Sequence, residues 1–572
     1  EKSAAVYLAN ANGSFINEEN GTIIADGTGS KAIQFGEGAK NATNKGIIIV
    51  KNSADGVVLT KNSEFTNEEK GIINVIDTNS KGIYVNGVGN TINKGTIVVG
   101  KDLETGKITS QTIGANVNGG SFENKKSIEV YGENSKGIAV YKGVATNKGT
   151  IVAQEKSAAV YLANANGSFI NEENGTIIAD GKGSKAIQFG EGAKNAINKG
   201  TIIAQNSADG IFLSADKIDF TNGETGKISA IGTGSKVINL NNKDAKATNN
   251  GIIEVSGGAT AVENKGTFIN NKTIQGEGIG VKLNNGLLIN SRTIDTTGNA
   301  IESYSGSNNT VYLKNGTKIN GKIVGNTGID VLALEGNKDG KNGKYSNLNV
   351  ENYEALVVRD GDVTVNNSNI SLNYNNGIGD YLKEAKEKLN NEVGEATSGN
   401  LTMNDSKLVI NFGDKLKTGE ALENPIIDVG ENGTLTFDGK TSFIFNSKDR
   451  DEYNVNEILG VDNIKFEEGM KLDSTIIWDY TFDENGNLIA KKDKYNNIIT
   501  NSYISDFASA LDKARPSFGS PEADPNNKFF ENVIVELESL KNAEEFTKGL
   551  AQVSGGIHGY TVDIAAINSR TL

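Results

Sequence analysis

Apolar and polar positions alternate in short runs along the first 325 residues, and the runs recur about every 25 residues. A motif close to N-K-G-T-I marks each repeat. Successive anchors of this motif are usually 23 to 26 residues apart, with one step of 31 where KDLETGKITSQ is inserted. Periods in this range are typical of solenoids and propellers. The anchors are Gly21, Gly46, Gly71, Gly95, Lys126, Gly149, Gly175, Gly200, Gly226 and Gly251.

The register inside each repeat predicts a strand, here called the anchor strand. The second residue after every anchor is isoleucine, and the fourth is alanine or valine. A spacing of two places both side chains on one buried face of a strand. We therefore expect the isoleucines to stack on one another from repeat to repeat. They are Ile23, Ile48, Ile73, Ile97, Ile128, Ile151, Ile177, Ile202, Ile228 and Ile253.

Two further strands are expected in each repeat. A second strand follows the anchor strand and has the form G/A-φ-x-φ, as in AIQF from Ala32 and GIYV from Gly82. A third strand precedes the anchor, and large and small residues alternate at its inward position, which would fill a core by interdigitation. That position holds Phe15, Ala42, Phe65, Thr91, Phe122, Ala145, Phe169, Ala196, Phe220 and Ala247.

These patterns predict an all-β fold, a right-handed parallel β-helix of about 25 residues and three strands per coil. About 13 coils precede residue 325, each adding about 4.8 Å. Asparagine recurs beside the anchors, from Asn17 and Asn44 onward, and predicts amide ladders between coils. Glycan attachment is the weaker interpretation, although NGS at Asn12 and NGT at Asn20 fit the sequon.

The pattern changes twice along the chain. Residues 1–325 carry the regular repeats, whereas residues 326–500 keep strand-like runs with a blurred period and one helical insertion at 381–393. Residues 501–572 predict a short helical linker, with helices at 504–514 and 529–552 separated by the proline-containing PSFGSPEADPNN.

Composition narrows the function classes. The formal net charge is −14 and the chain holds 69 glycines, four prolines and no cysteine. Nucleic-acid binding is not expected from such a charge. Disulfides and thiolate metal sites are excluded. The sequence shows no signal peptide and no long apolar run. Residue 1 falls inside a repeat, because EKSAAVYL recurs at Glu155, so we expect the chain to be a segment of a longer protein.

A family resemblance rests on three features: the cysteine-free Gly/Asn-rich repeats, the less regular β segment, and the tail SGGIHGYTVDIAAINSRTL. Together they resemble the passenger of a classical monomeric (type V) autotransporter. The N-K-G-T-I repeats are similar to the large fusobacterial adhesins. The resemblance implies an autochaperone-like role for residues 330–492. It also implies export through the periplasm, and outer-membrane anchoring by a C-terminal β-barrel beyond Leu572.

Candidate catalytic groups are sparse. A Ser-His-Asp triad needs a histidine, and the single one, His558, falls in the predicted linker. Multi-histidine metal sites are excluded, and no cofactor motif is present. Glycosidases need paired carboxylates, for which Asp55 and Asp77 are candidates, but their registers differ. We therefore do not expect an enzyme.

Aromatic residues at outward positions of the second strand are the candidate binding residues: Tyr7, Tyr84, Tyr161 and Phe212. Aromatic rings on a β face can stack on sugars or anchor a protein partner. Tyrosine also simply suits an exposed strand. The spacing of three coils between the tyrosines predicts separate contacts, not one patch.

The sequence therefore predicts a cell-surface adhesive stalk that presents more distal regions, with a host or bacterial surface protein or glycan as partner. A polysaccharide-acting β-helix enzyme and a secreted effector released by cleavage are the alternatives.

Overall fold

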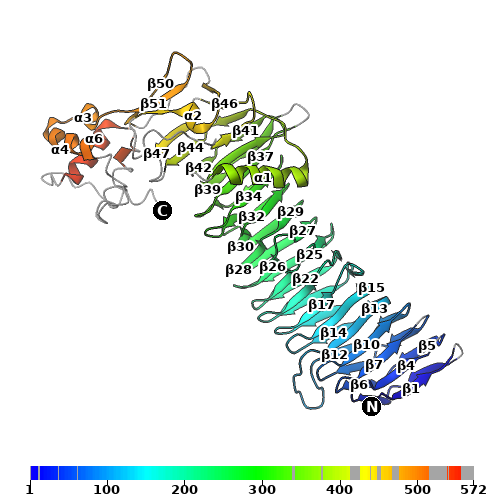
Figure 1. Cartoon of the computed structure of the whole chain (residues 1–572). Helices are drawn as coiled ribbons and strands as arrows, with labels where there is room; N and C mark the ends of the chain where they lie inside the picture. Colours follow the sequence, from blue (N-terminus) through cyan, green and yellow to red (C-terminus); the bar gives the residue numbers. More distant parts are fainter. Residues whose placement is uncertain are drawn as a thin grey trace. The chain divides into compact units, whose positions relative to one another are not determined.

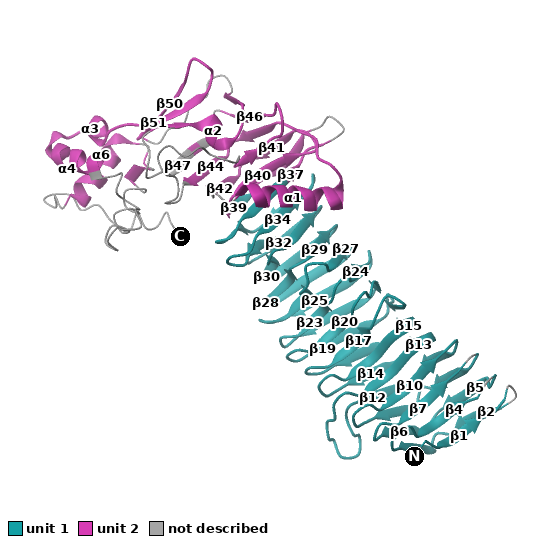
Figure 2. Ribbon diagram, viewed as in Figure 1, with its two compact units in different colours: residues 1–333, 348–350 teal, residues 334–347, 351–572 magenta. Residues whose placement is uncertain are grey.

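The computed structural model describes residues 2–10, 13–36, 38–60, 62–337, 342–374, 378–412, 426–438, 440–446, 452–466, 476–514, 537–538, 540 and 542–554. The chain is an all-β parallel solenoid of about 17 turns with few helices, matching a right-handed parallel β-helix as predicted (Figure 1). It divides into two compact units. Unit 1 comprises residues 1–333 and 348–350, and unit 2 comprises residues 334–347 and 351–572 (Figure 2).

Each early coil of unit 1 contains the three predicted strands. Coil 1 consists of β1 (Ala4–Leu8), β2 (Ser14–Asn17) and β3 (Thr22–Asp26). Each pairs in parallel with the strand of its own kind in coil 2. Later anchor strands are β6 (Ile47–Lys51), β9 (Ile72–Val75), β12 (Thr96–Val99), β14 (Ser127–Val130), β16 (Thr150–Ala153), β19 (Thr176–Asp180), β22 (Thr201–Gln205), β25 (Lys227–Ile231), β32 (Thr293–Thr296) and β35 (Lys318–Asn320).

The second and third strands continue in the same way. Second strands are β4 (Lys31–Phe35), β7 (Asp55–Leu59), β10 (Lys81–Asn86), β17 (Ala158–Leu162), β20 (Lys185–Phe189), β23 (Asp209–Leu213), β26 (Lys236–Leu240), β33 (Ile301–Ser303) and β36 (Ile323–Val324). Third strands are β5 (Asn41–Asn44), β8 (Glu64–Asn67), β11 (Asn90–Asn93), β18 (Gly167–Asn171), β21 (Asn195–Asn198), β24 (Asp219–Asn222), β27 (Lys246–Asn249), β29 (Thr267–Asn270), β31 (Leu287–Asn290), β34 (Asn309–Leu313) and β37 (Asp330–Glu335).

Four longer strands merge two of these segments where no sharp turn separates them. In β13 (Ile113–Asn124) and β15 (Lys136–Asn147) the second strand continues into the third. In β28 (Ile252–Asn264) and β30 (Thr273–Leu283) the anchor strand continues into the second. Within β13 and β28 the pairing shifts register, so the merged strands still bend around the core.

Isoleucine stacks on isoleucine through the core of unit 1, as predicted. The pairing register carries one column from Ile23 to Ile319 without a break. Ile202 is fully buried within it. The alternating Phe/Ala column of the third strand is also inward, and Phe169 and Ala196 are buried neighbours. Identical residues stack because the register between coils is constant over many turns.

An amide ladder runs beside this core and confirms the structural interpretation of the recurring asparagines. Each side-chain NH₂ group donates to the Oδ1 of the next asparagine at 2.7–2.8 Å. The ladder is buried, so every bond satisfies groups that water cannot reach. Its members are Asn17, Asn44, Asn67, Asn93, Asn124, Asn147, Asn171, Asn198, Asn222, Asn249, Asn270 and Asn290.

The anchor is glycine in most repeats because the preceding coil approaches it closely. A Cβ added to Gly46 would lie 2.2 Å from the carbonyl oxygen of Gly21. No side chain fits at that distance.

Unit 2 contains further parallel strands, a packed helix and a separate antiparallel sheet. The strands are β38 (Gly343–Ser346), β39 (Asn349–Tyr353, which begins in unit 1), β40 (Ala355–Arg359), β41 (Val363–Asn366), β42 (Asn369–Tyr374), β43 (Leu401–Asn404), β44 (Lys407–Phe412), β45 (Ile427–Asp428), β46 (Thr434–Phe437), β47 (Ser442–Asn446), β48 (Glu452–Asn454), β49 (Asn463–Phe466), β50 (Trp478–Phe482) and β51 (Leu488–Lys492). The helices are α1 (Ile378–Val393), α2 (Val455–Leu459), α3 (Tyr495–Ile498), η1 (Ser502–Ile504), α4 (Ser505–Ala514) and α6 (Ala543–Val553).

Helix α1 lies where the sequence predicts an insertion, and it is packed, not merely appended. One face of the helix is buried through Ile378, Tyr381, Leu382, Ala385 and Leu389. The buried guanidinium of Arg359 donates to the carbonyl oxygen of Gly394 at 2.7 Å and to Asn390 at 3.2 Å. A cation at the C-terminus of a helix also interacts favourably with the negative end of the helix dipole.

The end of unit 2 departs from the coil pattern. β50 and β51 pair antiparallel, as do β48 and β51, so these three strands do not add further parallel coils. Asp483 accepts backbone hydrogen bonds from Asn485 and Asn487, which closes the hairpin between β50 and β51. The predicted helix at 504–514 matches η1 and α4, and α6 matches the end of the one predicted at 529–552. Residues 529–536, the linker 516–527 and His558 lie outside the described residues.

Candidate binding surface

The four candidate aromatic residues lie in one column on the outward face of the second strands. Strand pairing places three coil steps between Tyr7 and Tyr84, three between Tyr84 and Tyr161, and two between Tyr161 and Phe212. Other residues of the column separate them, so they do not form one patch. The column reads Tyr7, Gln34, Val58, Tyr84, Asn116, Ala139, Tyr161, Gln188 and Phe212.

Three of the four rings have a lysine above them. The lysine Nζ lies 5.5 Å from the ring centroid for Lys81 and Tyr84, 4.9 Å for Lys136 and Tyr161, and 5.1 Å for Lys185 and Phe212. These are cation–π distances. Sequence reasoning missed the lysines, although each begins a second strand, at the position three residues before the aromatic column.

Burial shifts the pKa values of groups in these lysine–aromatic pairs. It lowers the pKa of Lys136 and of Lys185, because the stacked ammonium groups are partly removed from water. It also raises the pKa of Tyr161. The three paired rings are half-buried, whereas 59% of Tyr7 is exposed. An aromatic ring can stack on a sugar ring, and an ammonium group beside it can pair with a carboxylate that the sugar carries.

The tyrosines also reach across to the next coil. A Cβ added to Gly36 would lie 2.9 Å from the Tyr7 hydroxyl oxygen, and one added to Gly190 would lie 2.8 Å from that of Tyr161. The carbonyl oxygens of Leu8 and Ala163 lie as close or closer, at 2.9 and 2.5 Å, so glycine at these positions leaves room for both the preceding backbone and the tyrosine hydroxyls.

Farther along the same column the surface becomes charged. Glu263 accepts a hydrogen bond from the Tyr304 hydroxyl at 2.9 Å and pairs with Lys236 at 2.9 Å. Lys282 pairs with Glu302 at 3.0 Å and lies 4.4 Å from the Tyr304 ring centroid. In the sequence, this network is marked by polar and charged residues at one repeat position of successive coils: Asn239, Glu263, Lys282 and Glu302.

The electrostatics of this network follow from burial and from Lys236. Burial acts to raise the pKa of Glu263, but the hydrogen bond and charge of Lys236 outweigh it, so that pKa lies below its usual range. Burial raises the pKa of Asp209, and Lys236 and Asn239 offset only part of the effect. Burial and the Glu263 hydrogen bond raise the pKa of Tyr304 to about 12. Each carboxylate thus has a cation as its neighbour.

The carboxylates considered for glycoside hydrolysis occupy different kinds of position. Asp55 begins β7 and pairs with Lys81 at 3.2 Å. Asp77 lies in the turn after β9 with a φ of 65°. Among the described residues, no group of three or more His, Asp or Glu side chains is arranged to hold a metal ion.

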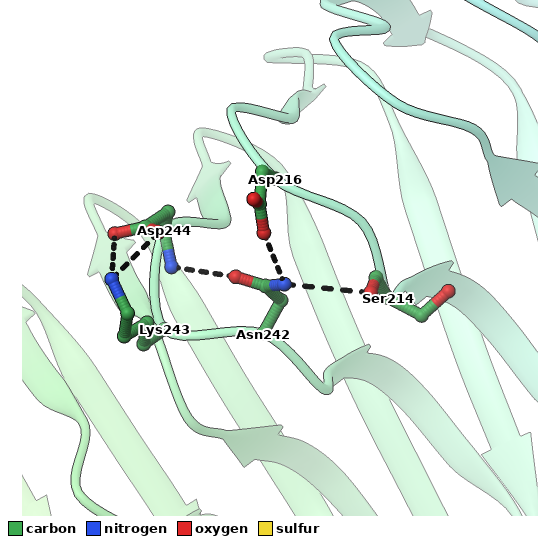
Figure 3. A network of polar contacts seen from close by, with 5 residues as sticks. All are labelled: Ser214, Asp216, Asn242, Lys243 and Asp244. Carbon is green, nitrogen blue, oxygen red and sulfur yellow. Dashed lines mark hydrogen bonds and ion pairs between the residues drawn. The ribbon is translucent and has the colours of Figure 1, made fainter.

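Exposed turns are linked by their own polar contacts (Figure 3). The side-chain amide of Asn242 donates to Asp216 at 2.8 Å and to the carbonyl oxygen of Ser214 at 3.5 Å, and Lys243 pairs with Asp244 at 2.8 Å. Asn242 and Asp216 belong to turns of successive coils, so this exposed network joins coil to coil.

No protein-family model matches the chain, and no curated protein matches it. Within the described part of the chain, no helix has both the length and the apolar character required to cross a membrane.

Proposed function

We propose that this chain is the stalk-forming passenger segment of an autotransporter-type adhesin, exposed at a bacterial cell surface. The observation that carries the proposal is the unbroken asparagine ladder from Asn17 to Asn290, alongside the isoleucine column. Each coil contacts its neighbours in the same register, so length is gained by adding coils without a new core. The proposal assigns no catalytic step, no cofactor and no metal.

The absence of cysteine suits this proposal, because a chain that is exported unfolded avoids premature disulfides. The sequence resemblance to fusobacterial adhesins supports it as well. A stalk acts through reach and stiffness and needs no cleft.

The proposed partner is a glycan or protein of a host or bacterial cell surface. The lysine–aromatic pairs at Tyr161 and Phe212 support a sugar that carries a carboxylate, because an aromatic ring and an ammonium group are offered side by side. At Tyr84 the ring alone is offered, since Lys81 is already paired with Asp55. Repetition along one face would also allow several weak contacts to act together.

A bead-adhesion assay tests the proposal. Beads coated with the purified chain are applied to epithelial cells, to other bacteria and to an array containing neutral and acidic glycans. We expect binding that falls by about tenfold when Tyr84, Tyr161 and Phe212 are all changed to alanine, because aromatic anchors dominate contact energy.

The matched control changes Gln34 and Gln188, half-buried residues of the same column, to alanine and should bind like the unaltered chain. Equal binding by the aromatic and the glutamine variants would show that the aromatic residues are not the contact. No binding to any of the three targets would contradict adhesion by this chain.

A further inference from the structure

The outward face of the second strands repeats a pattern every two coils in the middle of unit 1. The coils concerned are coil 6 (β15 and β16), coil 7 (β17, β18 and β19), coil 8 (β20, β21 and β22) and coil 9 (β23, β24 and β25). Through them the aromatic column reads Ala139, Tyr161, Gln188 and Phe212, so every second coil carries a ring. The column three residues earlier reads Lys136, Ala158, Lys185 and Asp209, so the coils between carry a lysine.

The two lysine–aromatic pairs of these coils are equivalent in geometry. Lys136 of coil 6 lies over Tyr161 of coil 7 at 4.9 Å, and Lys185 of coil 8 lies over Phe212 of coil 9 at 5.1 Å. Each lysine therefore reaches forward onto the ring of the following coil. The two pairs are separated by two coil steps, or about 9.6 Å.

The core of unit 1 alternates with the same period. The third strands of coils 6 to 9 pair Ala145, Phe169, Ala196 and Phe220 in register. Coils with the small core residue carry the lysine, and coils with phenylalanine carry the ring. The two-coil period is thus a property of whole stacked coils, not of two isolated pairs of side chains.

The ammonium groups of both pairs can meet an anion. Lys81 and Lys236, which occupy the same column in other coils, are each paired with a carboxylate, at 3.2 and 2.9 Å. In the described part of the chain, neither Lys136 nor Lys185 forms an ion pair, and Lys185 donates to the carbonyl oxygen of Gly183 at 2.9 Å. Both lysines are half-buried, so part of each side chain faces water.

Gln188 lies between the two rings. It pairs in register with Tyr161 on one side and with Phe212 on the other, and it is half-buried. A side-chain amide both donates and accepts hydrogen bonds, as sugar hydroxyl and acetamido groups require.

The pattern ends at coil 9, where carboxylates begin. Asp209 follows Lys185 in register, and its carboxylate accepts a hydrogen bond from Asn239 of the next coil at 3.2 Å. Lys236 of that coil pairs with Glu263 at 2.9 Å. An acidic ligand is therefore confined to coils 6 to 9.

We propose that coils 6 to 9 bind a linear acidic polysaccharide in which every second sugar carries a carboxylate. The polysaccharide runs from coil to coil along the second strands. One carboxylate pairs with Lys136 and the next with Lys185, and sugar faces pack against the exposed parts of Tyr161 and Phe212. Each sugar of an extended chain advances by about one coil step, so a disaccharide repeat matches the two-coil period. The inference names the ligand of the proposed adhesive surface and rests on that proposed function.

Calorimetric titration of the full chain with hexasaccharides of defined composition tests the inference. The hexasaccharide of alternating glucuronic acid and N-acetylglucosamine should bind about tenfold or more tightly than the neutral hexamer of N-acetylglucosamine, because only the former brings carboxylates to the lysines. A hexamer of galacturonic acid carries a carboxylate on every sugar. It should bind more weakly than the alternating hexasaccharide, since its additional carboxylates face Ala158 and Asp209.

Two pairs of substitutions separate the lysines of the site from general charge. Lys136→Gln/Lys185→Gln should weaken binding of the alternating hexasaccharide by about tenfold or more. Lys182→Gln/Lys194→Gln changes two exposed lysines of coil 8, removes the same charge and should bind like the unaltered chain.

The length of the ligand measures the spacing. In the alternating series, the step from disaccharide to tetrasaccharide should raise the affinity by about tenfold, because only the tetrasaccharide reaches both lysines. This gain should disappear in the single variant Lys185→Gln. Phe212→Val introduces the residue found at the same column position in coil 3, Val58, and should weaken hexasaccharide binding several-fold.

Three results would overturn the inference: equal binding of the alternating and neutral hexasaccharides, equal binding of the alternating hexasaccharide and the galacturonic acid hexamer, or equal binding by the two double-lysine variants. Beads that adhere in the assay above while the alternating hexasaccharide fails to bind would also overturn it, and would leave the adhesive function standing. Hexasaccharide binding without adhesion to any of the three targets would contradict the adhesive function alone.

Discussion

At the scale of single residues, stability in unit 1 comes from columns in which one residue type repeats. Ile202 is fully buried between Ile177 and Ile228, whereas its neighbour Ile203 points outward and is half-buried. The two adjacent isoleucines should therefore contribute very differently to the free energy of unfolding, and a pair of substitutions can measure the difference.

Ile202→Asp should lower the free energy of unfolding by roughly several kcal/mol, because it buries a charge that has no partner. Ile203→Asp, the matched control, should change it by roughly 0.5 kcal/mol or less, as surface substitutions do. Urea unfolding followed by circular dichroism measures both. Equal effects of the two variants would mean that the inward assignment is wrong.

The asparagine ladder makes a second prediction at this scale. Asn198→Ala removes the donor to Oδ1 of the buried Asn222. It also removes the shortest of the three hydrogen bonds that the side-chain amide of Asn171 donates. We expect a loss of roughly 2–4 kcal/mol in unfolding free energy, about 1–3 for the orphaned Oδ1 of Asn222 and about 1 for the bond that Asn171 loses. Asn195→Ala, at an exposed position of the same strand, should be nearly neutral in the same urea experiment. A ladder variant as stable as this control would count against the ladder as a source of stability.

Asp330 couples stability to pH. It is fully buried, and burial raises its pKa to about 6, although Asn309 and Ser303 donate hydrogen bonds to its carboxylate. The folded state thus favours the protonated form more than the unfolded state does. The stabilising contribution is complete below the ordinary pKa of 3.8 and is lost as the pH rises through about 6.

We expect the unfolding free energy of the unaltered chain, relative to Asp330→Asn, to fall by roughly 2 kcal/mol between pH 4 and pH 7.5. Urea titrations at several pH values measure this difference. The exposed Asp295→Asn variant provides the control and should show no inflection near pH 6. A difference that does not vary with pH would refute the coupling.

At the scale of elements, the inserted loop after β12 is held against the outward face of the anchor strands. The side-chain amide of Asn74 donates to the Lys101 carbonyl oxygen at 2.7 Å and accepts from the Leu103 N–H at 3.2 Å. Asn74 occupies a column position that is otherwise apolar in neighbouring coils, at Ile24, Ile49 and Val98. The asparagine is therefore explained by the loop it holds, which protrudes near β12 in Figure 1.

Asn74→Ala should release this loop, since both side-chain bonds are lost. We expect trypsin to cleave after Lys101 and Lys107 several times faster, roughly as expected for a loss of about 1–2 kcal/mol in local stability. Ile24→Ala, at an exposed position of the same column, should leave the cleavage rate unchanged. Mass spectrometry of the first fragments gives the rates, and equal rates in all three proteins would disprove the tether.

At the scale of the whole molecule, the 154-residue duplication allows unit 1 to be shortened by a deletion that creates no new sequence at the join. Deleting residues 28–181 joins Gly27 to Lys182, and the sequence around that join is the one already present at Gly181. Every remaining coil then keeps a neighbour that it contacts in the present structure.

This deletion should remove about six coils and shorten unit 1 by about 29 Å. The product should remain folded, with a urea midpoint close to that of the full chain, since stability is a sum of nearest-neighbour terms. X-ray scattering gives the change in maximum dimension. Deleting residues 28–169, which leaves the register broken, is the control and should disrupt cooperative unfolding; equal behaviour of the two deletions would contradict in-register stacking.

The sequence by itself determined the coil. Period-two alternation places Ile23 and Ala25 inside, and the constant spacing between anchors stacks identical residues in successive coils. The isoleucine column and the asparagine ladder therefore follow from the local pattern alone. It also located the four outward aromatic residues in one column, because a fixed register translates repeat position directly into place on the surface.

Only the tertiary structure decided what depends on neighbours from other coils. Sequence could not show that Lys136 covers Tyr161, that Asn74 holds the loop at Lys101, or that Arg359 binds the end of α1, because each contact joins positions set by three-dimensional packing. A repeat pattern sets the inward face of each strand, whereas these contacts depend on which side chains the neighbouring coils and the inserted loop bring beside it.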